Sequence, residues 1–209
     1  MRYVGVMGIC TAALVVLPVG RTAAQTCQGT ASFESGRLRA GGTASSTWTP
    51  GIARGQPMAY GLSVAYGAPR AWYATASATT PQWISPTDYQ SLSGSIGYQL
   101  PLGTSGWEFC PALYFATGGY PLRYANPIQG GFRAALGYRF AASSTFELVP
   151  SFVLNVWPEL FGATYVARFQ PGLGVGMVVN RQWTILPFVG DFLSGRGMLG
   201  VSVTRNFGR

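Results

Sequence analysis

The chain has 209 residues, enough for one domain, and only 10% of them are charged, well below the roughly 25% of a typical soluble domain. Its 14 basic residues are all arginine and are scattered singly, which argues against a nucleic-acid-binding patch, and the chain is too apolar to be disordered. After residue 24, no apolar run approaches the ~18 residues that a membrane-spanning helix needs. An apolar chain with 14% aromatic residues and 29 glycines, but without such runs, indicates a membrane β-barrel.

Residues 1–24 have the pattern of a secretory signal peptide. Arg2 provides the positive start, residues 3–19 form the apolar stretch, and small residues precede the expected mature N-terminus at Gln25. The alternative is a membrane anchor, but the stretch is short and is interrupted by proline. Residues 25–35 then form a short polar stub, which we expect in the periplasm, and the barrel domain covers residues 36–209. Loss of the two arginines of the signal segment lowers the formal charge from +8 to +6.

Cysteine usage predicts one disulfide. Cys10 lies in the signal segment, so the exported chain keeps Cys27 and Cys110, an even pair in an oxidising compartment. Cys27 precedes the first strand and Cys110 follows a short turn, so both are expected near the periplasmic mouth of the barrel. The alternative is two buried thiols that act as small hydrophobic groups.

Period-two alternation predicts the strands in chain order. It is clearest where one face is aromatic or aliphatic and the other is small or polar, as in residues 107–116, 132–140, 146–156 and 165–179. Weaker alternation adds 36–46, 58–66, 70–79, 91–100, 182–192 and 198–207. The prediction is therefore an all-β, antiparallel, up-and-down transmembrane β-barrel of about ten strands, with eight to twelve allowed.

The connections between these segments fall into two classes. Those after odd-numbered strands are mostly long: 47–56, 80–89, 117–130, 157–164 and 193–197. Those after even-numbered strands are short: 67–69, 101–106, 141–144 and 180–181. Outer-membrane barrels combine an even strand number with short periplasmic turns and longer external loops. A soluble two-sheet sandwich could share the strands, but it would cover its polar face with charge, and here that face is mainly Ser, Gly and Ala.

Charged residues on the small, inward face predict a network in the lumen. The expected members are Arg37, Arg39, Glu108, Arg133, Arg139, Glu147 and Arg168. The expected strand register places Glu108 opposite Arg139 and Glu147 beside it, so that Arg139 is flanked by both carboxylates. A charge in a narrow lumen requires a partner, so this arrangement predicts a structural ion-pair cluster. The six tryptophans lie near predicted strand ends and are expected to be interfacial anchors: Trp48, Trp72, Trp83, Trp107, Trp157 and Trp183.

The last strand carries a resemblance to a known family. Leu199, Val201 and Val203 alternate with small or hydroxyl residues, and the aromatic Phe207 lies near the C-terminus. With the alternation upstream, the chain resembles the small Gram-negative outer-membrane barrels of the opacity and OmpA-like type, over roughly residues 30–209. The resemblance implies an outer-membrane location with both termini periplasmic, contact with lipid and lipopolysaccharide, and recognition of the last strand by the barrel-insertion machinery. Arg205 departs from the pattern, because an apolar residue is expected there.

The sequence offers no catalytic residue that we would assign. It contains no histidine, which removes Ser-His nucleophiles, histidine acid–base chemistry and most zinc sites, and we expect no metal or cofactor. Glu108 and Glu147 share the inward face and could form a glycosidase-like pair, but the ion-pair interpretation explains them better. The predicted function is a non-enzymatic barrel with a structural or surface-interaction role carried by external loops. The alternative is a narrow passive pore with a weak anion preference. The ligand and the oligomeric state stay open.

Overall fold

The computed structural model describes residues 36–48, 58–81, 91–104, 106–118, 129–161, 164–192 and 197–207. The predicted signal peptide and periplasmic stub lie outside these residues. No helix among the described residues is long and apolar enough to cross a membrane.

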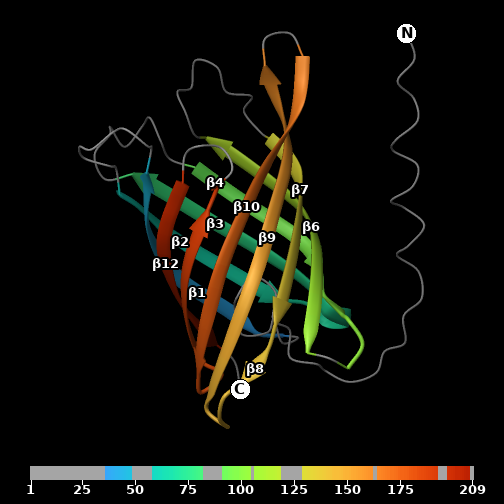
Figure 1. Cartoon of the computed structure of the whole chain (residues 1–209), viewed down its shortest axis with the longest axis vertical. Helices are drawn as coiled ribbons and strands as arrows, with labels where there is room; N and C mark the ends of the chain where they lie inside the picture. The colour runs from blue at the N-terminus through green and yellow to red at the C-terminus, as the bar shows by residue number, and fades with distance from the viewer. Residues whose placement is uncertain are drawn as a thin grey trace.

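The described residues form one closed antiparallel β-barrel with ten strand positions (Figure 1). The strands are β1 (Leu38–Trp48), β2 (Met58–Gly67), β3 (Trp72–Pro81), β4 (Ser91–Tyr98), β6 (Trp107–Gly118), β7 (Gln129–Tyr138), β9 (Phe146–Phe161), β10 (Thr164–Val179), β11 (Trp183–Gly190) and β12 (Gly197–Phe207). The two-residue β5 (Leu100–Pro101) continues β4, and β8 (Phe140–Ala141) continues β7; a short 3-10 turn, η2 (Pro69–Ala71), joins β2 to β3. Because β1 pairs with both β2 and β12, and β9 pairs with β10, the described strands close into a continuous ring. The predicted barrel and its strand number are confirmed, and the two-sheet sandwich is excluded.

Two proline residues explain why β4 and β7 are interrupted. The register is the same on both sides of each interruption, which places Tyr98 opposite Pro111 and Tyr138 opposite Pro150. Proline has no backbone N–H to donate to the ladder, so the pairing opens locally and resumes two residues later. The breaks are local and leave the faces of both strands unchanged.

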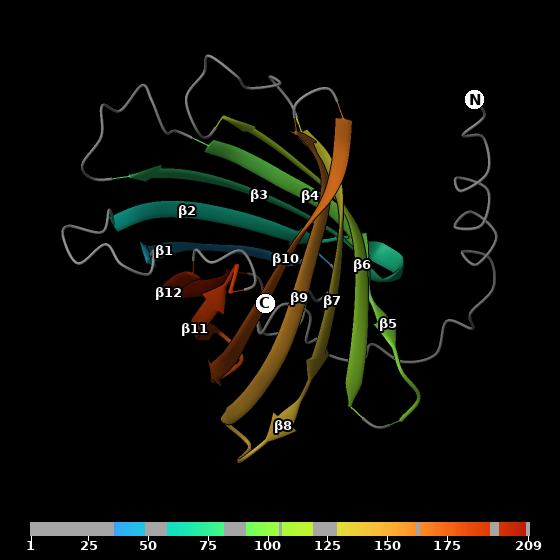
Figure 2. The same cartoon turned by 45° about the horizontal axis from the view of Figure 1, so that its top comes forward.

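The strands are staggered around the barrel, as closure requires. One row of paired residues begins at Leu38, the first residue of β1, and ends at Phe169, the sixth residue of β10. It passes through Tyr66, Ala74, Ile96, Leu113, Phe132 and Val156. The row therefore climbs from the end of the barrel that carries the short turns toward the end that carries the long loops, and the strands run obliquely to the barrel axis (Figures 1 and 2).

The two faces of the strands differ as predicted. Large apolar side chains face outward and are exposed, including Leu62 at 73%, Leu113 at 70% and Leu199 at 61%. The buried side chains of the inward face include many polar ones: Arg39, Ser45, Ser95, Gln99, Glu108, Glu147, Ser151, Thr184 and Thr204. This distribution is the reverse of a soluble domain, in which apolar residues fill the interior. It is the distribution of a barrel that meets an apolar solvent on its outside.

One predicted connection was wrong. Residues 157–164 were expected to form an external loop, but β9 continues to Phe161 and pairs with β10 from Thr164, so that only residues 162–163 separate the two strands. This extension of β9 contains Pro158. It is tolerated because β7 pairs with β9 only as far as Val156, and beyond that point β9 needs hydrogen bonds on the β10 side alone. Figure 1 shows this hairpin rising above the other strands.

Inward glycines make room for the large inward side chains. Gly200 of β12 lies opposite Phe188 of β11, and a Cβ atom at Gly200 would lie 2.5 Å from the Phe188 Cζ and 2.8 Å from the Ala44 carbonyl oxygen. Gly97 of β4 is covered in the same way by the ring of Tyr73, and Gly174 by Leu186. The Gly-rich inward faces are therefore occupied by neighbouring side chains, which narrows the lumen.

This packing predicts the effect of a single methyl group. Gly200→Ala should lower the free energy of unfolding by about 1–3 kcal/mol, because both the Phe188 ring and the backbone of β1 would have to move. Gly130→Ala is the control, since a Cβ there meets no heavy atom within 4 Å. Guanidinium unfolding in detergent micelles measures the difference. Equal stability of the two variants would contradict the packing described here.

Candidate functional site in the barrel lumen

The end of the lumen that carries the short turns is lined by a ring of buried residues. Every strand position contributes one: Arg39, Gly67, Tyr73, Gln99, Glu108, Gly137, Val149, Val178, Thr184 and Thr204. We call this ring the lumen floor. None of its side chains is more than 7% exposed, so water barely reaches them. The residues of the floor are therefore packed against their neighbours rather than exposed to solvent.

The other half of the lumen, toward the long loops, is lined differently. On β1, β3 and β4 the inward residues of this half are mainly Ser and Thr, β2 and β12 add Ser63 and Ser202, and several of these residues are partly exposed. They bond to each other across neighbouring strands: Thr75 to Ser95 at 2.7 Å, Ser77 to Ser93 at 2.7 Å, and the Thr43 hydroxyl donates to Ser202 at 3.2 Å. We call this surface the hydroxyl wall. Its side chains are short, in contrast to the Tyr, Gln and Arg side chains of the floor.

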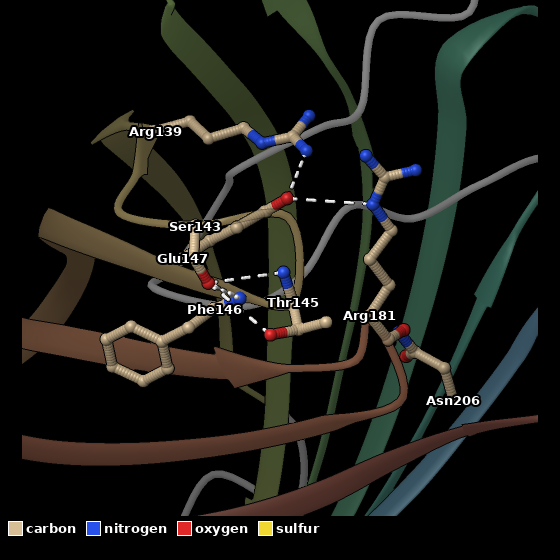
Figure 3. Close-up of polar contacts among 7 residues, drawn as sticks. All are labelled: Arg139, Ser143, Thr145, Phe146, Glu147, Arg181 and Asn206. Carbon is tan, nitrogen blue, oxygen red and sulfur yellow. Dashed lines mark hydrogen bonds and ion pairs between the residues drawn. The ribbon is translucent and has the colours of Figure 1, made fainter.

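Charged residues at the short-turn rim form a cluster around Glu147 (Figure 3). The Glu147 carboxylate accepts a hydrogen bond from Nη2 of Arg139, and Nε of Arg181 lies 3.6 Å from the same oxygen. The cluster continues across the rim through Asn206, whose side chain donates to the Arg181 carbonyl at 3.0 Å and accepts from Nε of Arg39 at 2.8 Å. These contacts link β7 and β9 with the 180–182 turn, β12 and β1.

The predicted centre of this cluster was wrong. Arg139 was expected to lie between Glu108 and Glu147, but Glu147 instead lies between two arginines, and Glu108 pairs with Gly137 in the register. A slip of two residues keeps every side chain on its own face, so alternation cannot detect it. Arg181 was missed because it lies in the turn, with a φ of 56°, rather than on a strand face.

A second arginine lies higher in the lumen. Arg133 of β7 donates from Nε to Oδ1 of Asn155 on β9 at 2.6 Å, and its guanidinium carbon lies 4.6 Å from the centre of the Tyr114 ring on β6. The predicted inward position of Arg133 is confirmed, but neither Glu108 nor Glu147 pairs with it. Its immediate partners are an amide and an aromatic ring.

The remaining predicted residues are placed as follows. Arg39 is buried in the floor, and Arg37 lies half-buried just before β1; each has a bonding partner. The side chain of Arg168 lies outside the described residues. Cys110 is completely buried beside Tyr73, Ala112 and Ala135, whereas Cys27 lies outside the described residues, so their pairing stays a prediction. On the last strand, the residues of the predicted insertion signal are exposed on the outer face: Leu199, Val201, Val203 and Phe207.

The described lumen offers little for catalysis. Among the described residues, no three His, Cys, Asp or Glu side chains come close enough to hold a metal ion. Glu147 is held by two arginines, as expected of a structural ion pair. The arrangement can bind or exclude solutes, but it provides no nucleophile with an adjacent base.

The rim cluster predicts an unequal response to two arginine substitutions. Arg139→Ala should lower the free energy of unfolding by about 1–3 kcal/mol, because Glu147 is 9% exposed and would keep only the longer contact to Arg181. Arg181→Ala should cost about 0.5 kcal/mol or less, since the Arg181 side chain is 66% exposed. Unfolding midpoints in detergent compare the two. A larger loss for Arg181→Ala would refute this ranking.

In comparisons with known proteins, this chain matches solved structures by its fold alone. No protein-family model matches the chain, and no curated protein matches it. Among solved structures, the KdgM porin in complex with disordered oligogalacturonate is 9% identical with a TM-score of 0.44, and the match covers 82% of this chain and 99% of that one. The β domain of the Bordetella autotransporter Brka is 13% identical with a TM-score of 0.44, covering 83% and 99%. The N-terminal β-barrel domain of Pseudomonas aeruginosa OprF is 11% identical with a TM-score of 0.33, covering 83% and 98%. The fold assignment stands on the strand pairings of this chain, and these likenesses assign no function to it.

Proposed function

We propose that the chain is a non-enzymatic outer-membrane β-barrel whose lumen is closed at the short-turn end, with a structural or surface-interaction role on the loop side. The observation that carries this proposal is the lumen floor, to which every strand position contributes a buried inward residue. A barrel closed in this way does not serve as a conduit. Its specificity then belongs to the external loops and to the half of the lumen that opens toward them.

Membrane residence is supported by the outer surface. The exposed apolar side chains of the strands form a band around the barrel, and an aromatic girdle lies at the short-turn rim. The girdle consists of Trp72 against Tyr98 at 5.3 Å, Trp107 against Tyr138 at 5.0 Å, and Trp183 beneath the Arg205 guanidinium at 5.3 Å. Such girdles mark membrane–water interfaces in transmembrane barrels. Arg205, which departed from the family pattern, fits this position because its charge lies at the interface.

The orientation follows from the connections. Leu38 pairs with Phe207, so the first and last described strands begin and end at the rim that carries the short turns. Since short turns face the periplasm in bacterial outer-membrane barrels, both termini would be periplasmic, and the long loops would face outward beside lipopolysaccharide. Residues 1–24 would direct export, and β12 would be the strand that the barrel-insertion machinery recognises.

A narrow anion-preferring pore is the second candidate. It is favoured by the hydroxyl wall and by Arg133, which make the loop-side half of the lumen polar and positively charged. The buried floor argues against it, because ions would have to pass through residues that are almost inaccessible to water.

The membrane-facing surface makes a testable prediction. Leu113→Arg should destabilise the barrel in phospholipid vesicles by about 2–4 kcal/mol, because it places a charge in the apolar band. Leu102→Arg is the matched control: Leu102 is also exposed, but it lies in the turn after β5, where the cost should be about 0–1 kcal/mol. Denaturant unfolding monitored by tryptophan fluorescence measures both. Equal costs would contradict burial of this face in lipid.

The closed floor predicts the absence of steady conductance. The mature chain reconstituted in planar bilayers should give no stable single-channel steps at moderate voltage. Removing floor bulk with a Tyr73→Ala, Gln99→Ala double variant should introduce such steps, because these two side chains are 1% exposed and occupy the floor. Stable anion-selective steps from the wild-type chain would instead establish the pore.

The predicted Cys27–Cys110 disulfide is part of the proposal. Cys110 faces inward one row above the floor, where a periplasmic N-terminal segment could reach it and lipid could not. The bond would close a loop of about 80 residues and add roughly 4 kcal/mol of stability. Mass spectrometry of exported protein that has been denatured and alkylated without reduction should show both cysteines unmodified. Alkylation of either cysteine under these conditions would contradict the bond.

A further inference from the structure

Arg133 presents a cation to the loop-side half of the lumen, and no carboxylate among the described residues pairs with it. In the described part of the barrel, its hydrogen bond goes to the Asn155 amide and its face lies over the Tyr114 ring. The carboxylate of Glu147, at the short-turn rim, is already held by two other arginines. The N–H groups on Nη1 and Nη2 of Arg133 therefore make no hydrogen bond to a described residue and can donate to a ligand.

The surroundings hold the guanidinium in one orientation. Asn155 lies directly opposite Arg133 in the register and fixes Nε, while Tyr114, on the strand at the other side, supports the plane of the group. A guanidinium fixed through Nε and one face exposes its two Nη atoms as a fork. That fork matches the two oxygens of a carboxylate, which it can bind with parallel hydrogen bonds.

The facing side of the lumen suits a hydroxylated ligand. Several inward residues of β1, β3, β4 and β12 near this level carry hydroxyl groups: the Ser95–Thr75 and Ser93–Ser77 pairs, and Thr43 with Ser202. Their hydroxyls can donate to and accept from alcohol groups of a solute. Arg133 and much of the hydroxyl wall remain partly exposed, so a solute entering from the loop side can reach them.

We propose that the Arg133 fork, held by Asn155 and Tyr114, is a binding site for the carboxylate of a small hydroxylated solute that enters from the loop side. This inference rests on the proposed closed floor, because a closed floor makes the loop-side lumen a place where a solute stops rather than a passage. The site is reached from the external side, as a surface-interaction role requires.

The experiment is calorimetric titration of the mature, detergent-folded chain with gluconate, a six-carbon hydroxy acid, and with sorbitol, its neutral polyol counterpart. Gluconate should bind with measurable affinity, and sorbitol should bind at least tenfold more weakly. Arg133→Gln should weaken gluconate binding at least tenfold. Arg133→Lys, which keeps the charge and loses the fork, should give an intermediate affinity.

Arg205→Gln is the matched control, because Arg205 is also an arginine stacked on aromatic rings but is exposed on the outer surface. It should leave gluconate affinity unchanged. Heat-modifiable gel migration verifies that each variant is folded, and Arg133→Lys provides the test if Arg133→Gln does not fold. Equal affinity of the Arg133 and Arg205 variants, equal binding of sorbitol, tighter binding of inorganic phosphate than of gluconate, or no binding to the wild-type chain would each overturn the proposal. None of these results depends on conductance, so the closed floor is judged separately.

Discussion

The structure depends on the satisfaction of backbone hydrogen bonds by closure of the sheet. In an apolar surrounding, an unpaired strand edge would leave a row of N–H and C=O groups without partners, and only a closed barrel removes both edges. Here β1 makes that closure with β12, the strand at the other end of the chain. Once the sheet is closed, each strand has one face outside and one inside. Alternate residues of the sequence then face the outer surface and the lumen.

The inward side chains have to fill a narrow space without steric clashes and without unpaired like charges. The chain does this by placing large residues against glycines, as with Phe188 against Gly200 and Tyr73 against Gly97, and by neutralising charges in place. Glu147 between Arg139 and Arg181, followed by Asn206 and Arg39, connects five parts of the barrel at one rim. The same rim carries the aromatic girdle on its outer side, so the floor and the interface anchors lie at one level and support each other.

The loop-side half of the lumen follows a different rule. Its hydroxyl pairs are short and locally satisfied, and its arginine is fixed by an amide and a ring rather than by a carboxylate. Stability alone would favour an acidic partner for a charge in this environment. An arginine that is fixed in orientation and keeps its terminal donors is better explained by recognition than by packing. In the proposed function, the barrel thus divides into a closed end that maintains the fold and an open end that binds a solute.

The sequence by itself determined the strands, their number and the side of the wall on which each residue lies, because a period of two is visible wherever the two faces meet different solvents. Glu108, Arg133 and Cys110 were placed inside, and Leu113 and Leu199 outside, from that period alone. Register was decided only by the tertiary structure, since a slip of two residues preserves both faces. Glu108 therefore lies opposite Gly137 rather than Arg139, and the partner from the turn, Arg181, could not be found. The length of the β9–β10 hairpin was likewise decided by its neighbours, because Pro158 is tolerated only where β7 no longer pairs with β9.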